Sequence, residues 1–434
     1  MSASLPLTIL ADRGQKFTCR GCAQCCRDLV VHLTPADVER IDRHVGADTA
    51  PSYVRLGRKR VLAKQPNGAC VFLTDQDRCR LHADFGPKAK PLACRMFPFT
   101  MRLVDKTWQA AIRFDCPTVA RSDGESLSAH RDELGGLSRT LSSVITAESD
   151  AVELSRGIAG TPSEVRGAIE AIDRCMRSGR SAADFERRFR TAAFVSDMLA
   201  RAKLEKVRGP RLAELIDILV SGASEELEAT PMAPASARGR RLFRQLIFAY
   251  GTSMSLDDMR RGSFARVAMI LRQLRDARRF KQGRGPLPWA DKNHGTDNSH
   301  LSTSPNTPTF AQVETVHCAD GDDVGPISEL LTRYVRSRLA SRTICGAGYY
   351  GWPLFEGLSA LWLSVVAIGW FARLAACRAG RNRINFDDVV DGVGMVDRGI
   401  GRLPALGTQT ERLRTRYLTH DGTLQSLLTS YPIP

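Results

Sequence analysis

Four cysteines within eight positions carry the strongest chemical signal in this sequence: Cys19, Cys22, Cys25 and Cys26, in the run FTCRGCAQCC. Gaps of two residues let a turn direct successive thiolates at one ion or cluster. Tetrahedral zinc takes four Cys or His ligands, and a four-iron cluster takes four thiolates. The bacterial ferredoxin motif begins with the same C-x2-C-x2-C spacing. The run therefore predicts a thiolate-ligated site for zinc or for an iron–sulfur cluster.

A second set of cysteines is spread more widely, at Cys70, Cys79, Cys94 and Cys116. Thiolates select zinc or iron–sulfur clusters over magnesium or calcium. One site with four ligands would leave half of these eight thiols unused, whereas two metals, or one cluster with additional ligands, would use more of them. The spacing alone leaves these arrangements open.

The adjacent pair Cys25 and Cys26 favours an iron–sulfur cluster over zinc. Neighbouring residues on an extended chain point to opposite sides, so Cys19, Cys22 and Cys25 would converge while Cys26 served a second role. Cys116 is followed by proline, as is the last cysteine of the ferredoxin motif. Two zinc ions that share the eight thiols evenly are the alternative.

The order of these motifs resembles a known family. The segments FTCRGCAQCCRDLVVHLTPADVERI, ACVFLTDQDRCRLH, KPLACRMFPF and DCP, between residues 17 and 117, are similar to the bacterial cysteine-cluster family with the CxxCxxCC signature. That family is described as a zinc- or iron-chelating domain and includes the flagellin lysine-N-methylases. The resemblance implies metal ligands drawn from all eight cysteines, and its small departures at Ala23 and His82 remove none of them.

The resemblance also implies an alternative function, a protein lysine N-methyltransferase that would use S-adenosylmethionine. The sequence assigns no catalytic residue to that activity. Gly346 to Gly351 fits the pattern G-x-G-x-x-G, but a dinucleotide site requires a strand before it. A helical pattern over 327–341 precedes it instead, so we predict a turn that leads into a helix over 353–378. We therefore expect a metal-binding protein, and its role as an enzyme stays open.

The elements around the cysteines are predicted to form a small, loop-rich module over residues 1–120. The segment has few aliphatic residues to form a core, and small units of that kind commonly need an additional cross-link such as a bound metal. Thr34, followed by proline and then Asp37, predicts the start of a helix. Strand-like patterns cover 70–74 and 108–114.

The rest of the chain is predicted to be a helical body, which makes the fold class mainly α. Apolar residues at helical period recur over 121–285 and over 327–434. Between them, residues 286–326 are rich in Gly, Pro, Ser, Thr, Asn and Asp, and we predict a loop or disordered linker there. The chain of 434 residues is long enough for such a division.

The amino-acid composition limits the classes of binding partner and the cellular location that we expect for the protein. The net charge of +15 comes almost wholly from arginine, but no basic patch with interleaved aromatic residues accompanies it, so we expect no nucleic-acid partner. A protein substrate or partner fits the helical body better. The longest uncharged apolar run, 357–372, falls short of a membrane span, which needs about 18–20 residues. The start of the chain has no signal-peptide pattern, so we expect a cytoplasmic location, where clustered cysteines bind metals.

Overall fold

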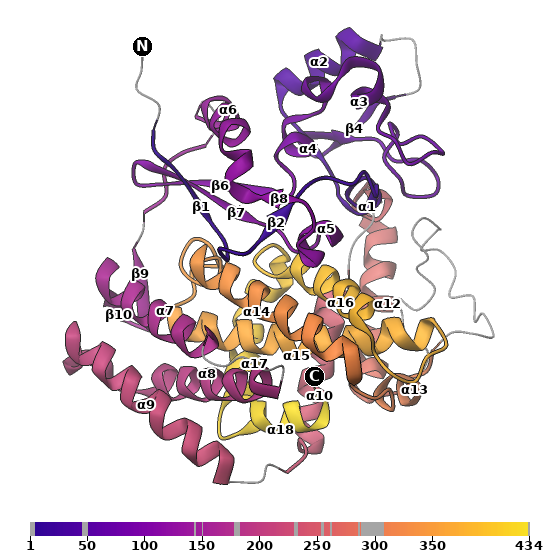
Figure 1. Cartoon of the computed structure of the whole chain (residues 1–434). Helices are drawn as coiled ribbons and strands as arrows, with labels where there is room; N and C mark the ends of the chain where they lie inside the picture. The colour runs from indigo at the N-terminus through magenta and orange to yellow at the C-terminus, as the bar shows by residue number, and fades with distance from the viewer. Residues whose placement is uncertain are drawn as a thin grey trace.

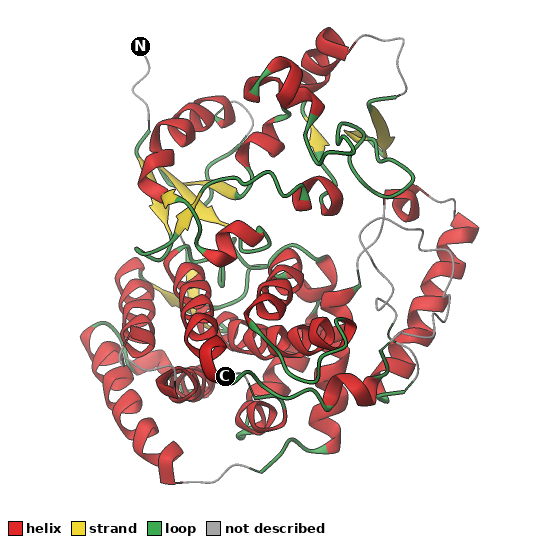
Figure 2. Ribbon diagram, turned by 45° about the vertical axis from the view of Figure 1, so that its right-hand side comes forward, coloured by secondary structure: helices red, strands yellow, loops and turns green. Residues whose placement is uncertain are grey.

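A computed structural model of the protein describes residues 5–45, 51–142, 145–149, 151–177, 183–229, 233–252, 256–260, 263–284, 287 and 308–432. These residues contain eighteen α-helices and ten short strands, which confirms the mainly α class predicted from the sequence. Figure 1 shows a small N-terminal lobe above a larger helical body, and Figure 2 shows most of the strands gathered in the upper part of the molecule.

The lobe that carries most of the cysteines, here called the cysteine lobe, comprises residues 18–94. Its core is built from a few side chains, among them Ile41, Phe72 and Leu81. Strands β3, β4 and β5 form an antiparallel sheet in the order β3-β5-β4, in which Val54 pairs with Val61. The elements of the lobe are α1 (Gln24–Asp28), β3 (His32–Leu33), α2 (Pro35–Val45), β4 (Tyr53–Leu56), β5 (Lys59–Leu62), α3 (Arg80–Phe85) and α4 (Leu92–Met96).

Helix α2 starts as the sequence predicts. The Thr34 hydroxyl accepts a hydrogen bond from the Asp37 N–H (3.1 Å), and the Asp37 carboxylate accepts one from the Thr34 N–H (3.0 Å). This reciprocal pair satisfies two donors at the helix start. The strand expected over 70–74 is absent: Cys70 and Leu73 make only isolated bridges, to Lys64 and Cys79, within a series of turns.

A second, three-stranded sheet joins the cysteine lobe to the body. Strand β7 lies in its centre, with β1 parallel on one side and β6 antiparallel on the other. The predicted strand over 108–114 corresponds to β7. The elements of this region are β1 (Leu7–Leu10), β2 (Lys16–Phe17), β6 (Phe99–Val104), β7 (Thr107–Ile112), α5 (Pro117–Arg121), β8 (Glu125–Ser126) and α6 (Arg131–Leu141).

This sheet packs into the hydrophobic core of the body rather than into that of the cysteine lobe. Trp108, Phe114 and Val119 are fully buried in the same cluster as the helices that follow. The segment predicted as one module over 1–120 is therefore shared between two hydrophobic cores. The domain boundaries themselves stay a prediction.

The body is a bundle of helices around α15, with one short hairpin, β9–β10, beside it (Figure 1). Its elements are β9 (Val152–Ser155), β10 (Ile158–Gly160), α7 (Pro162–Arg177), α8 (Ala183–Arg201), α9 (Pro210–Ala229), α10 (Ala237–Gly251), α11 (Leu256–Arg260), α12 (Ser263–Lys281), α13 (Phe310–Glu314), α14 (Val324–Ala340), α15 (Leu354–Arg378), α16 (Phe386–Gly399), α17 (Gln409–Thr419) and α18 (Thr423–Ser430). Of the predicted linker 286–326, residues 286 and 288–307 lie outside the described residues, and the rest includes α13, which packs on α15.

Helix α15 is the centre of the body and is buried on every side. By length and composition alone it could cross a membrane, but 89% of its most apolar window is buried among other elements. Core helices of globular proteins pass the same test. The loop before α15 approaches it so closely that a Cβ on Gly357 would lie 1.7 Å from the Ile344 carbonyl oxygen, which explains the glycine there.

Candidate metal centre

Four separate segments of the cysteine lobe bring their cysteines together. Cys26 lies on α1, Cys70 follows β5 in a turn, Cys79 caps the N-terminus of α3, and Cys94 lies on α4. The thiolates of these residues act on one another electrostatically: Cys26, Cys70 and Cys79 each raise the pKa of Cys94. The structure thus gathers one cysteine of the CxxCxxCC run with three of the widely spaced set.

Backbone hydrogen bonds hold these segments in place. The Cys26 carbonyl oxygen accepts from the Cys70 N–H (2.9 Å) and from the Lys64 ammonium (2.9 Å). The Arg80 N–H donates to the Phe72 carbonyl oxygen (2.8 Å), which fixes the turn that joins Cys70 to Cys79. These hydrogen bonds help to place the thiols, alongside the packing of the lobe, in which Cys70 is itself a core residue.

Burial is the main reason why the neutral thiol is favoured at two of these positions. It raises the pKa of Cys70 to about 11, and it raises the pKa of Cys94 well above the ordinary value. The neighbouring thiolates add to both effects, whereas the Lys64 ammonium near Cys70 and the Lys90 ammonium near Cys94 oppose them. Ionisation of these buried thiols would therefore require a nearby positive charge, which a metal ion could provide.

The conformation of the chain at Cys25 and Cys26 differs from the prediction. The sequence predicted an extended segment in which the two side chains point to opposite sides. Ala23 adopts a left-handed conformation (φ 58°) and starts the helix α1, so the two cysteines are about 100° apart around a helix axis. Their side chains hydrogen-bond to each other. This bond, together with the charges of Lys90, Lys64 and Arg27, lowers the pKa of Cys26 to about 6 against the effect of burial, and it raises the pKa of Cys25.

The other three cysteines of the predicted set lie apart from this group. Cys116 is buried at the N-terminus of α5, where burial raises its pKa to about 11 although the Val119 and Thr118 N–H groups oppose the shift. Cys22 is close enough to add to that shift. Cys19 and Cys22 are exposed, on a loop that the Arg20–Asp123 ion pair (2.7 Å) ties to the body.

The donor chemistry of the group fits a thiolate-bound metal, because sulfur ligands suit zinc and iron–sulfur clusters. Within the described ranges, which include all twelve cysteines, no three His, Cys, Asp or Glu side chains close around a single ion. Cysteines outside the lobe, at positions 175, 318, 345 and 377, lie in the body and take no part in the group.

Comparison with known families agrees with this geometry. Residues 18–117 match the family CxxCxxCC, described as "Putative zinc- or iron-chelating domain". This segment is therefore similar to the CxxCxxCC domain family over about a quarter of the chain. The match contains all eight cysteines of the predicted set and ends at the start of α5, so the helical body lies outside it. Comparisons with curated proteins and with solved structures gave no match.

The resemblance noted in the sequence is therefore confirmed for residues 18–117, and the CxxCxxCC domain indicates that the protein chelates zinc or iron. Sequence reasoning identified the eight cysteines but did not anticipate Lys64 and Lys90. A lysine between two cysteines gives no local signal, because its proximity to the thiols depends on how the lobe folds.

Proposed function

We propose that the protein holds a metal centre whose principal ligands are Cys26, Cys70, Cys79 and Cys94. The convergence of these four thiols from four segments is the observation that carries the proposal. Cys25 lies beside them and is hydrogen-bonded to Cys26, so we propose that it serves as an alternative metal ligand or donates a proton to the site. Lys64 and Lys90 offset the negative charge that four thiolates bring.

We propose an iron–sulfur cluster at this site in preference to zinc. The support comes from the donor set, because an iron–sulfur cluster is held by four thiolates. The ferredoxin-like C-x2-C-x2-C spacing belongs to Cys19, Cys22 and Cys25, which are not among the four principal ligands. Zinc remains the alternative, because four thiolates also complete a tetrahedral zinc site. Cys25 and Cys26 lie on a helix and not on an extended chain, so their adjacency does not favour either metal, and the experiment below decides between them.

The centre would serve a structural or electron-transfer role, and the helical body would bind a protein substrate or partner. A bacterial cytoplasmic location suits this role, because cytoplasmic thiols stay reduced. None of the twelve cysteines, all of them in described residues, forms a disulfide. No nucleic-acid partner and no membrane span are part of this proposal.

The alternative function, a protein lysine N-methyltransferase that uses S-adenosylmethionine, rests on the family resemblance. The glycine segment 346–351 forms a tight turn in which the Gly346 N–H donates to the Trp352 carbonyl oxygen (2.8 Å), and α14 precedes it. This turn does not have the strand–loop–helix form of a dinucleotide site. Transfer of a methyl group from S-adenosylmethionine to lysine in a candidate substrate protein would favour the alternative.

Anaerobic purification followed by metal analysis and an absorption spectrum tests the proposal. An iron–sulfur cluster gives a brown, oxygen-sensitive protein with about equal iron and sulfide. A colourless protein with stoichiometric zinc would show that the metal is zinc and not an iron–sulfur cluster, and it would leave the proposed ligands unchanged. Protein that binds neither metal after anaerobic reconstitution would refute the metal centre.

A further inference from the structure

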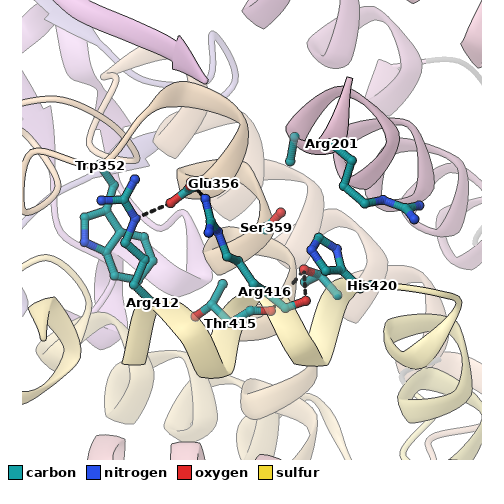
Figure 3. A pocket seen from close by; sticks show the side chains of 10 residues that line it. Arg201, Trp352, Glu356, Ser359, Arg412, Thr415, Arg416 and His420 are labelled. Carbon is teal, nitrogen blue, oxygen red and sulfur yellow. Dashed lines mark hydrogen bonds and ion pairs between the residues drawn. The ribbon is translucent and has the colours of Figure 1, made fainter. Parts of the chain in front are cut away.

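A polar cavity of about 250 Å³ lies in the helical body, between α8, α15 and α17. Figure 3 shows the side chains that line it, with Arg412 and Arg416 rising from α17 toward Glu356 on α15. Ligand sites often lie between helices of a bundle. The cavity is far along the chain from the CxxCxxCC domain and none of its lining residues is a cysteine.

The face that α17 turns toward the cavity is made wholly of polar residues. These residues follow the spacing i, i+3, i+4, i+7 and i+8 that normally forms the apolar stripe of a helix: Arg412, Thr415, Arg416, Thr419 and His420. Leu413, next to Arg412, is instead 55% exposed. Leu418 of the same helix is fully buried in the core, so α17 packs on the body through one face and turns a separate, polar face toward the cavity.

Among the side chains that line the cavity, positive charges outnumber negative ones. Glu356, only 4% exposed, accepts hydrogen bonds from Arg412 Nε and from Arg416 Nη2 (2.5 Å). Burial opposes ionisation of Glu356, but these two bonds outweigh it and lower the pKa of the carboxyl group. Two guanidinium groups thus share one carboxylate, and one positive charge is left over.

The guanidinium of Arg412 also retains hydrogen-bonding capacity. Its Nη2 is buried and has no hydrogen-bond partner among the described residues. Buried donors almost always have a partner. Trp352, which the tight turn at 346–351 delivers to the cavity wall, lies under the same guanidinium with its ring centroid 5.9 Å from Arg412 Cζ.

A histidine completes the cavity at its far end. His420 Nδ1 is 2.7 Å from Asp197 Oδ1, and Arg201 Nη2 donates to the other oxygen of Asp197 (2.7 Å). Asp197 therefore fixes the orientation of the His420 ring, and it shares the charge of Arg201 with Asp421, which lies 3.1 Å from the Arg201 Nη1. The second ring nitrogen of His420 is left as a further hydrogen-bonding group at the cavity.

We propose that this cavity binds a small molecule that carries an oxyanion, a carboxylate or a phosphate, held by Arg412 and Arg416. Guanidinium groups bind both kinds of oxyanion through paired hydrogen bonds. Trp352 covers the apolar part of the ligand, and His420 binds a polar group at its other end. The cavity volume restricts the ligand to a small metabolite.

Binding of inorganic phosphate and of succinate to the full-length, metal-loaded protein tests the proposal, with sodium chloride at equal ionic strength as the reference. We expect at least one of the two probes to raise the thermal midpoint in a saturable way and to give a calorimetric isotherm. A response to phosphate alone identifies a phosphate ligand, and a response to succinate alone identifies a carboxylate ligand. No saturable response to either would overturn the proposal.

Three variants make the test specific. Arg416→Gln leaves Arg412 on Glu356 and should weaken binding at least tenfold, whereas Ala200→Phe fills the cavity from α8 without changing a charge and should abolish binding. Arg139→Gln, an exposed arginine on α6, is the charge-matched control and should bind as the wild type does. Circular dichroism and metal content show that each variant is folded and loaded. Binding that persists in both cavity variants would refute this site.

Discussion

The cysteine lobe and the helical body are stabilised by different interactions. The body buries a large continuous core around α15, with tryptophans, phenylalanines and many aliphatic side chains. The core of the lobe contains only a few buried apolar side chains, and the Cys70 thiol is part of it. Small cores supply little stabilisation, so such units commonly rely on metals or disulfides. The body should therefore fold by burial of apolar side chains alone, whereas the stability of the lobe should depend on metal bound to its thiols.

Loss of metal on substitution of a single principal ligand is the largest effect that we expect. Cys94→Ser should reduce the metal content by tenfold or more, because removing one of four thiolates opens the site. Metal analysis of the purified protein gives the measurement. Cys175→Ser, which changes a buried thiol in the body, is the matched control and should retain full metal content. Full occupancy in Cys94→Ser would exclude this cysteine as a ligand.

Removal of the metal from the wild-type protein should separate the two regions. The binding free energy of a structural metal is about 10 kcal/mol or more in small metal-stapled units, and it is then folding free energy. A strong chelator should therefore make the cysteine lobe sensitive to proteases while the far-UV circular dichroism of the body persists. If both regions unfolded together, the lobe would have to be counted as part of the core of the body.

The junction between the regions contains a buried ion pair that should matter to the body and not to the metal. Asp397 is fully buried, pairs with Arg338 and accepts hydrogen bonds from the Phe114 N–H (2.8 Å) and the Asp115 N–H (3.2 Å). Asp397→Asn should lower the free energy of unfolding by about 3–5 kcal/mol, because it leaves Arg338 as an unpaired buried charge.

Chemical denaturation measures that loss, and Asp387 on the same helix provides its control. Asp387 pairs with Arg121 at the surface (2.6 Å), where the side chain of Asp387 is 67% exposed. Asp387→Asn should therefore cost about 1 kcal/mol or less. Both variants should keep their metal. Similar costs for the two substitutions would show that burial does not distinguish these ion pairs.

The smallest effect concerns pH and an acidic residue of the body. The hydrogen bond from Arg208 holds the pKa of Glu164 well below its ordinary value against the effect of burial, and the Thr161 and Gly209 N–H groups contribute as well. A carboxylate with a depressed pKa stabilises the fold above its unfolded pKa, about 4.3, and this stabilisation is lost as the pH falls below that value.

Glu164→Gln removes the ionisable group and provides the measurement. The variant should be less stable than the wild type by about 1 kcal/mol at pH 7, and the difference should shrink as the pH falls from about 4 toward 2. Urea denaturation at several pH values gives both quantities. A difference that stays constant with pH would mean that the ionised carboxylate is not the stabilising form.

The sequence by itself determined the class of chemistry and most of the local structure. Cysteine spacing identified thiolate chelation, and helical periodicity predicted the helices over 327–341 and 353–378 that the structure contains as α14 and α15. The cap at Thr34 was also predicted, because it depends on residues that are near in the chain. The strand over 108–114 was predicted from its own residues, although it pairs with the distant β1 as well as with its neighbour β6. The sequence likewise identified the eight cysteines of the CxxCxxCC domain.

Only the tertiary structure decided which of those cysteines meet. Cys26 approaches Cys70, Cys79 and Cys94 because the turns of the lobe return to α1, and no spacing within the run encodes that return. The cavity is a second instance. Arg412 and Arg416 look like the solvated face of a basic helix in the sequence, yet they bind Glu356, which precedes them by 56 and 60 residues. The pattern of residues within a segment indicates which side chains that segment carries. Contacts between distant segments depend on how the hydrophobic core packs, so only the tertiary structure shows which side chains face each other.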